Sequence, residues 1–532
     1  MYNIYKYTVV TTFGTKRIYR VLGMILSECY KTCLILANSI TKRISLYFMK
    51  IKVQLQILCC LFAMGILSGC SKNPVTGKKE IIFMSEDKEK ALGAESHPSV
   101  VASMGLYEDK NLNAFINEKG KAMGKISHRP ELTYQFFIVD SPVVNAFAVP
   151  GGYVYFTRGI MAHFNNEAEF AGVLGHEIGH VTARHSASQQ TKQVFSQGVL
   201  LAGSVLSPTF RGLADQASQG LGLLLLKYSR DHESQSDELG VEYSSKIGYD
   251  AHEMADFFGT LKKISEKAGQ SIPTFQSTHP DPGNRQVKVE KLATTYQTAH
   301  QAKYAVNRDS YLRRIEGLIY GVDPKQGFVE DGQFYHPGLK FQFPVPSGWQ
   351  SENTPAQFQM ASKDGKAMML FTLAEGKSLD EAAQTVIKNY GLQVSENNKT
   401  TINGNPAIVL ISKQAAEGQA AAANAAQVAS WLIQYNGNIY AIHGVSAGND
   451  FNSNFNQFKG VAQGFKALTD ASKLNREPDR IRVKTVQNAG TLRDALKSYN
   501  MADSKMDDLA ILNGMDLSAK VDKGMLIKTL GK

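Results

Sequence analysis

The sequence predicts an α+β protein with a mainly helical first region that holds a small β-sheet, followed by an α+β region and a small βααβ unit. Three observations support this prediction. The chain has 532 residues, too many for one ordinary core, and its 43% hydrophobic and 20% charged residues are typical of globular proteins. Helical periodicity prevails before residue 127 and alternating β-forming residues follow it. Beyond residue 335, strand patterns and amphipathic helical patterns are mixed.

In chain order, the first helices are expected within 85–95 and 109–126. Alternating β-forming residues in 132–157, interrupted by the tight-turn residues 150–152, indicate strands. The stretch 199–230 is apolar and rich in glycine, but a proline and charged residues interrupt it. Packed helices are therefore predicted there in place of a membrane span.

The formal net charge of +10 at pH 7 comes mostly from one end of the chain. Residues 1–69 contain nine Lys and Arg residues and one Glu, so the remaining residues carry a net charge of only +2. This balance gives no case for a nucleic-acid partner, and none is predicted.

All five cysteines lie at or before Cys70, so the residues after it form neither a disulfide nor a cysteine metal site. Residues 49–69 contain two lysines followed by an apolar run that is too short to span a membrane and has the proportions of a signal peptide. Their last residues and Cys70 form Leu-Ser-Gly-Cys, which resembles a bacterial lipobox and implies cleavage before Cys70 and lipidation of this cysteine. The alternative is an uncleaved hydrophobic N-terminus. Residues 1–48 are interpreted as a misassigned extension upstream of Met49.

The segment GHEIGHVTARH, residues 175–185, carries two histidines four residues apart. On a helix, His176 and His180 lie on one face one turn apart, and both can reach one metal ion. Glu177 then lies beside the pair and can hold and deprotonate a water at the metal without being a ligand. Because a catalytic zinc site uses three protein ligands, this pattern requires a third ligand elsewhere. The alternative is a helix with two structural histidines.

The segment KYSRDHESQSDELG places Glu233 and Asp237 four residues apart on a predicted helix. Beside the histidine pair, this spacing offers one ligand and one carboxylate that supports a ligand. The longer side chain of Glu233 gives it more reach, but the spacing also allows the two roles to be exchanged. The alternative is an acidic, solvated helix face.

Together these motifs resemble the gluzincin metallopeptidases of peptidase family M48, which include HtpX-like and BepA-like enzymes and the CAAX prenyl proteases. The resemblance covers about residues 73–322. It rests on NPVTGKKE, NAFAVPGGYVYFTRG, HEIGHVTARH, YSRDHESQSDELG and STHPDPGNR, in this order. It implies a zincin-like fold, one Zn²⁺ per chain and the hydrolysis of peptide bonds. Ser236 departs from the family, which commonly has alanine there, and leaves both carboxylates in place.

The resemblance also implies roles for individual residues. The zinc ligands are His176, His180 and Glu233, the general base is Glu177, and Asp237 orients a ligand histidine. His279 in STHPDPGNR matches a loop histidine that approaches the zinc and either stabilises the oxyanion or blocks the water site. Its alternative is a loop histidine without a role at the metal. Arg285 is expected to fix that loop or to pair with a carboxylate. Independently of the resemblance, His185 and Arg184 are expected to be structural, because they lie near the end of the histidine helix and favourably oppose its dipole.

The hairpin segment NAFAVPGGYVYFT has two interpretations. It is either ordinary sheet core or an edge strand to which an extended substrate adds by β-augmentation, as is known for similar zinc peptidases. In the second interpretation, Asn145, Ala146 and Phe147 bind substrate. Such binding depends on the peptide backbone and suits unfolded or misfolded polypeptides.

The C-terminal residues weakly resemble a LysM module, a fold of βααβ order that binds peptidoglycan, although the usual Gly-Asp-Thr-Leu start is Ala-Gly-Thr-Leu here. Peptidoglycan is therefore a candidate partner. A linker is expected at 322–334, and the alanine-rich 415–427 is interpreted as a loop or a helical insertion. The expected organisation is an extension at 1–48, a signal peptide at 49–69, a lipidated tether at 70–84, a metallopeptidase domain at 85–322, an α+β domain of unknown role at 335–470 and a LysM-like module at 478–532.

We therefore expect a periplasmic bacterial protein, lipid-anchored to the outer membrane, that cleaves misfolded or unassembled envelope proteins. The rival hypothesis is an envelope-anchored binding or chaperone-like protein whose zinc site is structural or gated. The intact Glu177 weighs against the rival, because a structural site has no need for a base.

Overall fold

The computed structural model describes residues 70–82, 84–190, 228–268, 279, 282–414, 426–447 and 449–532, with a few isolated positions before residue 53. The expected signal peptide, the apolar stretch up to residue 227 and the alanine-rich 415–425 lie outside the residues that the structure describes. The expectations for these segments stay predictions. Within the described part of the chain, no helix has the length and apolar character needed to cross a membrane.

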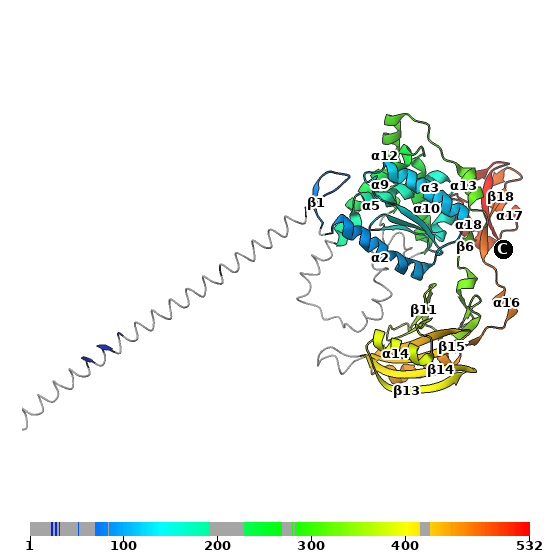
Figure 1. Ribbon diagram of the computed structural model, residues 1–532. Coiled ribbons are helices and arrows are strands. Elements are labelled where there is room, and N and C mark those ends of the chain that lie inside the picture. The colour runs from blue at the N-terminus through cyan, green and yellow to red at the C-terminus, as the bar shows by residue number, and fades with distance from the viewer. Residues whose placement is uncertain are drawn as a thin grey trace, which may run out of the picture. The chain divides into compact units, whose positions relative to one another are not determined.

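The region expected to hold the metal site is mainly helical and contains a three-stranded sheet (Figure 1). The strand order is β3-β5-β4, with β3 parallel and β4 antiparallel to the central β5. The turn at 150–152 joins β4 to β5, as the sequence predicts, and Gly151 and Gly152 both adopt positive φ there. The elements are β1 (Cys70–Lys72), β2 (Lys79–Ile81), α2 (Glu86–Met104), α3 (Lys110–Ile126), β3 (Gln135–Val139), β4 (Ala146–Val149), β5 (Tyr153–Thr157), α4 (Arg158–His163), α5 (Glu167–Thr182), α9 (Arg230–Lys246), α10 (His252–Ala268), α12 (Pro282–His300) and α13 (Arg308–Arg314).

The next region is built on a seven-stranded antiparallel sheet in the order β10-β11-β12-β16-β15-β14-β13. α15 packs against one face of this sheet and α14 against the other, so each face has its own hydrophobic core. The elements are β9 (Phe341–Pro344), β10 (Gln350–Asn353), β11 (Gln357–Ala361), β12 (Ala367–Leu373), α14 (Leu379–Asn389), β13 (Leu392–Ile402), β14 (Asn405–Gln414), β15 (Ala426–Tyr435), β16 (Asn438–Ala447), α15 (Phe451–Gln463), β17 (Lys466–Ala467) and α16 (Ala471–Leu474).

The segment expected to be a linker forms strands instead. β7 (Phe328–Glu330) and β8 (Gln333–His336) follow β6 (Ile319–Tyr320) and a 3-10 turn at Pro324–Gln326, and they belong to a four-stranded sheet of order β17-β9-β8-β7. The sequence does not predict these strands, because they are short and because the tight turn between them, Asp331 and Gly332, has the composition of a linker. The side chain of Phe334 on β8 is buried in the core that also holds Phe341 and Phe343.

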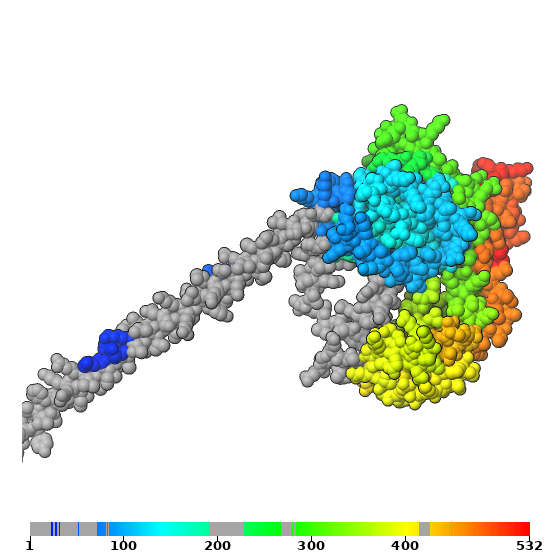
Figure 2. Space-filling view, in the orientation of Figure 1, coloured from blue at the N-terminus to red at the C-terminus, as the bar shows by residue number. Residues whose placement is uncertain are grey.

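The last 54 residues follow the predicted order of strand, helix, helix and strand. The elements are β18 (Asp479–Thr485), β19 (Gly490–Thr491), α17 (Leu492–Ser498), a 3-10 turn at Asp503–Lys505, α18 (Met506–Leu512), β20 (Lys520–Val521) and β21 (Leu526–Gly531). We call 479–531 the C-terminal segment. It does not have a core of its own: its buried residues, from Ile481 to Ile527, belong to the same hydrophobic cluster as α3, α5 and α10. In the space-filling view its orange and red surface adjoins the green surface of the metal-site region (Figure 2).

A buried lysine fastens the C-terminal segment to the metal-site region. Lys528 on β21 is fully buried, and its Nζ donates to the carbonyl oxygens of Ala162 and Phe164 at 2.9 and 3.0 Å. These carbonyls lie at the end of α4, just before α5 begins. Burial lowers the pKa of Lys528 to about 7, although Glu169 opposes the shift.

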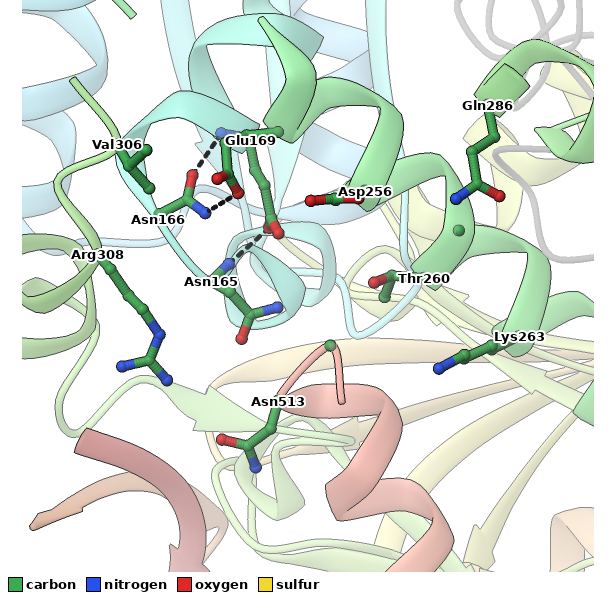
Figure 3. A pocket seen from close by; sticks show the side chains of 13 residues that line it. Asn165, Asn166, Glu169, Asp256, Thr260, Lys263, Gln286, Val306, Arg308 and Asn513 are labelled. Atoms are coloured by element: carbon green, nitrogen blue, oxygen red, sulfur yellow. Dashed lines mark hydrogen bonds between the residues drawn. The ribbon is translucent and has the colours of Figure 1, made fainter. Parts of the chain in front are cut away.

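A polar cavity of 390 Å³ lies beside this junction, between the start of α5, α10 and the C-terminal segment (Figure 3). Asn165 and Glu169 line one side of it, and Asn513 and Gly514 line another. The cavity therefore has walls from both the metal-site region and the C-terminal segment.

Candidate metal centre

The helix that carries the histidine pair is buried along its whole length. Asn166 caps the N-terminus of α5 by accepting a hydrogen bond from the backbone N–H of Glu169 at 2.7 Å. Glycines allow close packing on one side of the helix, where a Cβ at Gly175 would lie 3.0 Å from the backbone of Gly240 on α9. The close approach of these two helices brings Glu233, on the first turn of α9, next to the histidines.

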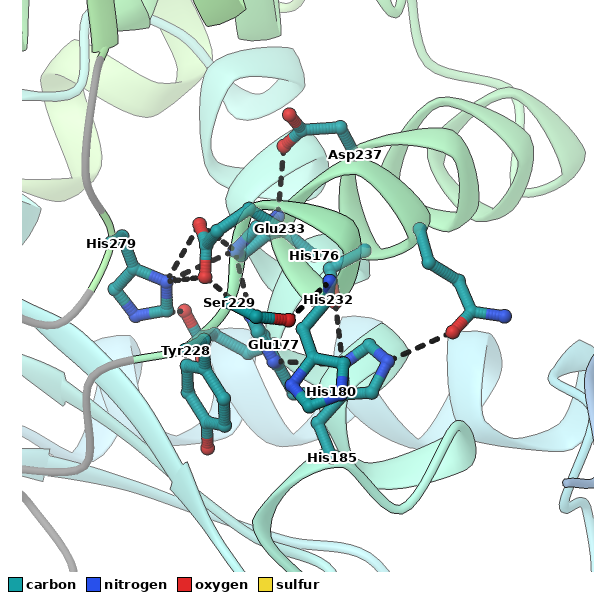
Figure 4. A network of polar contacts seen from close by, with 12 residues as sticks. His176, Glu177, His180, His185, Tyr228, Ser229, His232, Glu233, Asp237 and His279 are labelled. Atoms are coloured by element: carbon teal, nitrogen blue, oxygen red, sulfur yellow. Dashed lines mark hydrogen bonds and ion pairs between the residues drawn. The ribbon is translucent and has the colours of Figure 1, made fainter. Parts of the chain in front are cut away.

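The side chains of His176, His180, Glu233 and His279 converge in the interior (Figure 4). One ligand atom from each lies within 4.8 Å of the others, and all four residues are buried. The two Nε2 atoms of His176 and His180 are 3.0 Å apart, and carboxylate oxygens of Glu233 lie 3.7 and 3.5 Å from them. This donor set of imidazole and carboxylate groups is the kind that zinc prefers.

The hydrogen bonds around His176 fit a cation at its Nε2. Nδ1 of His176 lies 3.0 Å from Oδ1 of Asp237, which is fully buried. Burial by itself raises the pKa of Asp237, but Arg285 and His176 outweigh it and lower the pKa to about 2. An ionised carboxylate only accepts, so the proton of His176 is on Nδ1 and the lone pair of Nε2 faces His180. A shared cation relieves the repulsion between such lone pairs.

Arg285, on α12, holds the two carboxylates of α9. Its Nε and Nη2 donate to the two oxygens of Asp237 at 3.0 and 2.6 Å, and its Nη1 lies 2.8 Å from Oε2 of Glu233. The guanidinium also lies over the ring of Phe258, 4.3 Å from its centroid. Burial by itself raises the pKa of Glu233, but His279 and Arg285 outweigh it and keep the pKa below its ordinary value. Both carboxylates are therefore ionised and fixed in place.

Glu177 is fully buried beside this cluster. Its two carboxylate oxygens have no hydrogen-bond partner among the residues that the structure describes, and Nε2 of His279 lies 3.7 Å from Oε1. Burial raises its pKa above the ordinary value, although His279 and His176 oppose the shift. A carboxylate in this state is poised to hold and deprotonate a small polar molecule that enters the site.

His279 lies in the cluster and not at its edge. Its Nδ1 is 3.2 Å from Nε2 of His176 and 3.1 Å from Oε1 of Glu233. The carboxylates of Glu233 and Glu177 raise the pKa of His279 above its ordinary value, although burial, the largest single effect, lowers it. His279 thus occupies space where a ligand of the metal would bind.

Two residues that are not among the predicted site residues contact His180, an expected zinc ligand. Nδ1 of His185 lies 3.0 Å from Nδ1 of His180. The ring of Tyr228 stacks on that of His180 at a centroid distance of 3.9 Å. The sequence predicts a structural role for His185 at the end of the histidine helix, whereas α5 ends at Thr182 and His185 lies beyond it.

The expected substrate strand is β4, which lies at one edge of the three-stranded sheet and packs against α5. Asn145, Ala146 and Phe147 are all buried. Asn145 bonds to Thr157 on β5, and Ala146 and Phe147 pair with β5. Cys70, the expected site of lipidation, begins β1.

Comparison with known proteins agrees with this site. The family model described as Peptidase family M48 matches residues 107–293. A β-barrel assembly-enhancing protease of Yersinia pestis is 29% identical over 60% of this chain and 63% of its own length. A putative protease of the same name from Vibrio cholerae is 27% identical over 49% of this chain and 57% of its own. The mitochondrial metalloendopeptidase OMA1 of Arabidopsis thaliana is 29% identical over 36% of this chain and 38% of its own.

The alignments thus span less than two thirds of the length of these curated relatives. Solved structures give weaker matches. The cyanobacterial PsbP protein of Synechocystis matches 25% of this chain and 91% of its own, with a TM-score of 0.22 and 11% identity. The Ran-binding protein Mog1p of Saccharomyces cerevisiae matches 27% of this chain and 99% of its own, with a TM-score of 0.21 and 13% identity. Such scores carry no argument about the fold.

The family match covers both α5 and the start of α9, and the buried imidazole and carboxylate cluster lies where these helices meet. The chain therefore contains a zinc-dependent metallopeptidase domain of peptidase family M48.

Proposed function

We propose that the chain is a zinc endopeptidase of the bacterial cell envelope that cleaves misfolded or unassembled polypeptides. The names of two relatives, β-barrel assembly-enhancing proteases, support an envelope substrate. The lipobox-like motif supports a lipid anchor at Cys70, and the outer membrane is the proposed location. The βααβ order of the C-terminal segment supports a LysM-like module, with peptidoglycan as its candidate partner.

The observation that carries the proposal is the state of Glu177. A structural zinc site needs ligands and no base. Here a fully buried carboxylate, with no hydrogen-bond partner among the described residues, lies beside the three proposed zinc ligands His176, His180 and Glu233. Burying it without a partner costs free energy, and a catalytic base is a reason to keep it.

In the proposed mechanism, a bound zinc ion supplies a Lewis acid that polarises the substrate carbonyl and makes water more acidic. Glu177 orients the attacking water, takes one of its protons and delivers that proton to the leaving amine. Asp237 and Arg285 keep His176 and Glu233 oriented throughout. An extended substrate pairs with the edge of β4 at Asn145, Ala146 and Phe147, because backbone pairing accepts any unfolded sequence.

A gated site is the second candidate, and the position of His279 favours it. Nδ1 of His279 lies at hydrogen-bond distance from both His176 and Glu233, so His279 would compete with water for a metal held by these residues. In this hypothesis the resting enzyme is held inactive until His279 moves away. The alternative role, stabilisation of the oxyanion, requires the same side chain to shift toward the substrate carbonyl.

Hydrolysis of casein by the full chain tests the proposed function. We expect cleavage that stops with a zinc chelator and returns with added zinc. Glu177→Gln should abolish cleavage while zinc content and thermal stability stay near wild type, because Glu177 is not a ligand. Full turnover by pure Glu177→Gln protein would refute the mechanism. A second arm tests the anchor: Cys70→Ser should leave the precursor unprocessed, and mass spectrometry that finds the same mature N-terminus in this variant would refute the anchor.

A further inference from the structure

The chain turns sharply after α5 and brings His185 back against His180. α5 ends at Thr182, and Arg184 adopts a left-handed backbone conformation with a φ of 57°. As a result, Nδ1 of His185 lies 3.0 Å from Nδ1 of His180. The other ring nitrogen of His185, Nε2, lies 2.8 Å from Oε1 of Gln235. Gln235 is on α9, two residues after Glu233, so His185 connects the two helices that supply the zinc ligands.

Contacts from outside the turn hold Arg184 in its unusual conformation. A left-handed conformation is unfavourable for a residue other than glycine, because its Cβ crowds the backbone. Nε of Arg184 donates to Oε2 of the buried Glu89 at 2.9 Å, and its Nη2 donates to the carbonyl of Met84 at 2.7 Å. Arg129 donates to the other oxygen of Glu89 at 3.2 Å. The turn is therefore fixed by α2 and the residues just before it, and it places His185 reproducibly.

The hydrogen bonds determine which ring nitrogen carries each proton. Two nitrogens 3.0 Å apart share one proton, so one ring donates and the other accepts. The carbonyl oxygen of Gln235 only accepts, which puts the proton of His185 on Nε2 and leaves Nδ1 as the acceptor. His180 then carries its proton on Nδ1. Its Nε2 presents a lone pair toward Glu233, whose Oε1 is 3.5 Å away, as a metal ligand must.

We propose that His185 is a positioning residue for the metal ligand His180. It fixes both the orientation and the tautomer of that ring, as Asp237 does for His176, but it does so with a neutral acceptor in place of a carboxylate. His185 itself contacts neither the metal nor the substrate. The inference rests on the proposed zinc site and deepens it, since it adds a residue that sets zinc affinity from outside the ligand set.

Two replacements of His185 separate the hydrogen bond from packing. His185→Phe keeps a ring that stacks on His232, now at a centroid distance of 4.2 Å, but has no acceptor. His185→Asn loses the ring but places a side-chain oxygen close to the position of Nδ1. Zinc affinity is measured on the full chain by competition with a chromogenic chelator, and the Co²⁺-substituted protein is compared by visible absorption. His232→Phe is the matched control, because it keeps the ring stack and leaves the bond between His180 and His185 intact.

We expect His185→Phe to lose about 10- to 100-fold in zinc affinity and to change the Co²⁺ spectrum, while the metal-free protein unfolds near the wild-type temperature. His185→Asn should recover most of the affinity, and His232→Phe should bind as the wild type does. Folded His185→Phe protein with wild-type affinity and spectrum would overturn the proposal. If His185→Phe does not fold, zinc affinity is measured on Gln235→Leu, which removes the acceptor of the His185 Nε2 proton. Unchanged zinc affinity in this variant would overturn the proton assignment, and a lower zinc affinity would support it. Absence of zinc from the wild type itself would instead refute the proposed function.

Discussion

The close packing of α5 on α9 gives a prediction about a residue that is neither a ligand nor a base. Gly175→Ala adds a Cβ that would lie 3.0 Å from both Cα and O of Gly240, and backbone atoms cannot rotate away. An ordinary contact is about 3.5–4.0 Å, so the two helices must separate by roughly 0.5 Å. Zinc sites tolerate departures of only about 0.2 Å in their ligand distances. Because Glu233 is on α9 and both histidines are on α5, this separation acts directly on the metal centre.

The expected result is a loss of zinc affinity of at least about tenfold, as for other changes that displace a ligand. Overpacking costs about 1–3 kcal/mol of stability and the better helix propensity of alanine offsets about 1 kcal/mol of it, so the metal-free protein should lose only about 0–2 kcal/mol and remain folded. Chelator competition and thermal unfolding are measured side by side. Gly460→Ala, on α15, is the control, because a Cβ there meets no atom within 4 Å. Unchanged zinc affinity in a folded Gly175→Ala protein would refute the argument that glycine contact sets the ligand geometry.

Four further predictions follow from single residues. Glu233→Ala should be metal-free after dialysis against a weak chelator, whereas Asp237→Ala should keep part of its zinc, as measured by zinc stoichiometry. If instead Asp237→Ala is metal-free and Glu233→Ala keeps its zinc, then Asp237 is the ligand and Glu233 the supporting carboxylate. His279→Ala should raise the basal rate of casein hydrolysis if this residue blocks the metal, and a lower kcat with unchanged KM would favour oxyanion stabilisation instead. Lys528→Ala should lower the free energy of unfolding by about 2–4 kcal/mol, because it empties buried space and leaves carbonyls of α4 without a donor; a change too small to measure by denaturant titration would contradict this. Burial lowers the pKa of His443 from 6.5 to about 4, so between these pH values the unfolded chain binds a proton that the folded chain does not. The free energy of unfolding should therefore fall by up to roughly 3 kcal/mol as the pH drops from 6.5 to 4, and His443→Gln should remove this part of the acid sensitivity.

The sequence is most informative where function depends on local spacing. The four-residue separations of His176 from His180 and of Glu233 from Asp237 are properties of single helices, and the structure brings these residues together. Arg285 was expected to pair with a carboxylate, and it binds two. These predictions needed no knowledge of how distant segments pack.

Contacts that depend on a break in regular structure were missed. The role of His185 follows from the left-handed turn at Arg184, and no local preference of an arginine predicts that conformation. The pairing that holds the turn comes from Glu89, 95 positions earlier in the chain. The sequence likewise predicts the βααβ order of the C-terminal segment, but hydrophobic periodicity alone does not say that its helices pack into the core around α5 and α10.

The shared core has a consequence for how the protein tolerates truncation. The cluster that contains Phe170 and Leu174 of α5 also contains Leu526 and Ile527 of β21, and Lys528 reaches the end of α4. A chain cut after residue 500 lacks these partners, so the core that packs around α5 is incomplete. Truncation near residue 520 is therefore expected to loosen α5 and the buried metal cluster without removing any residue of that cluster.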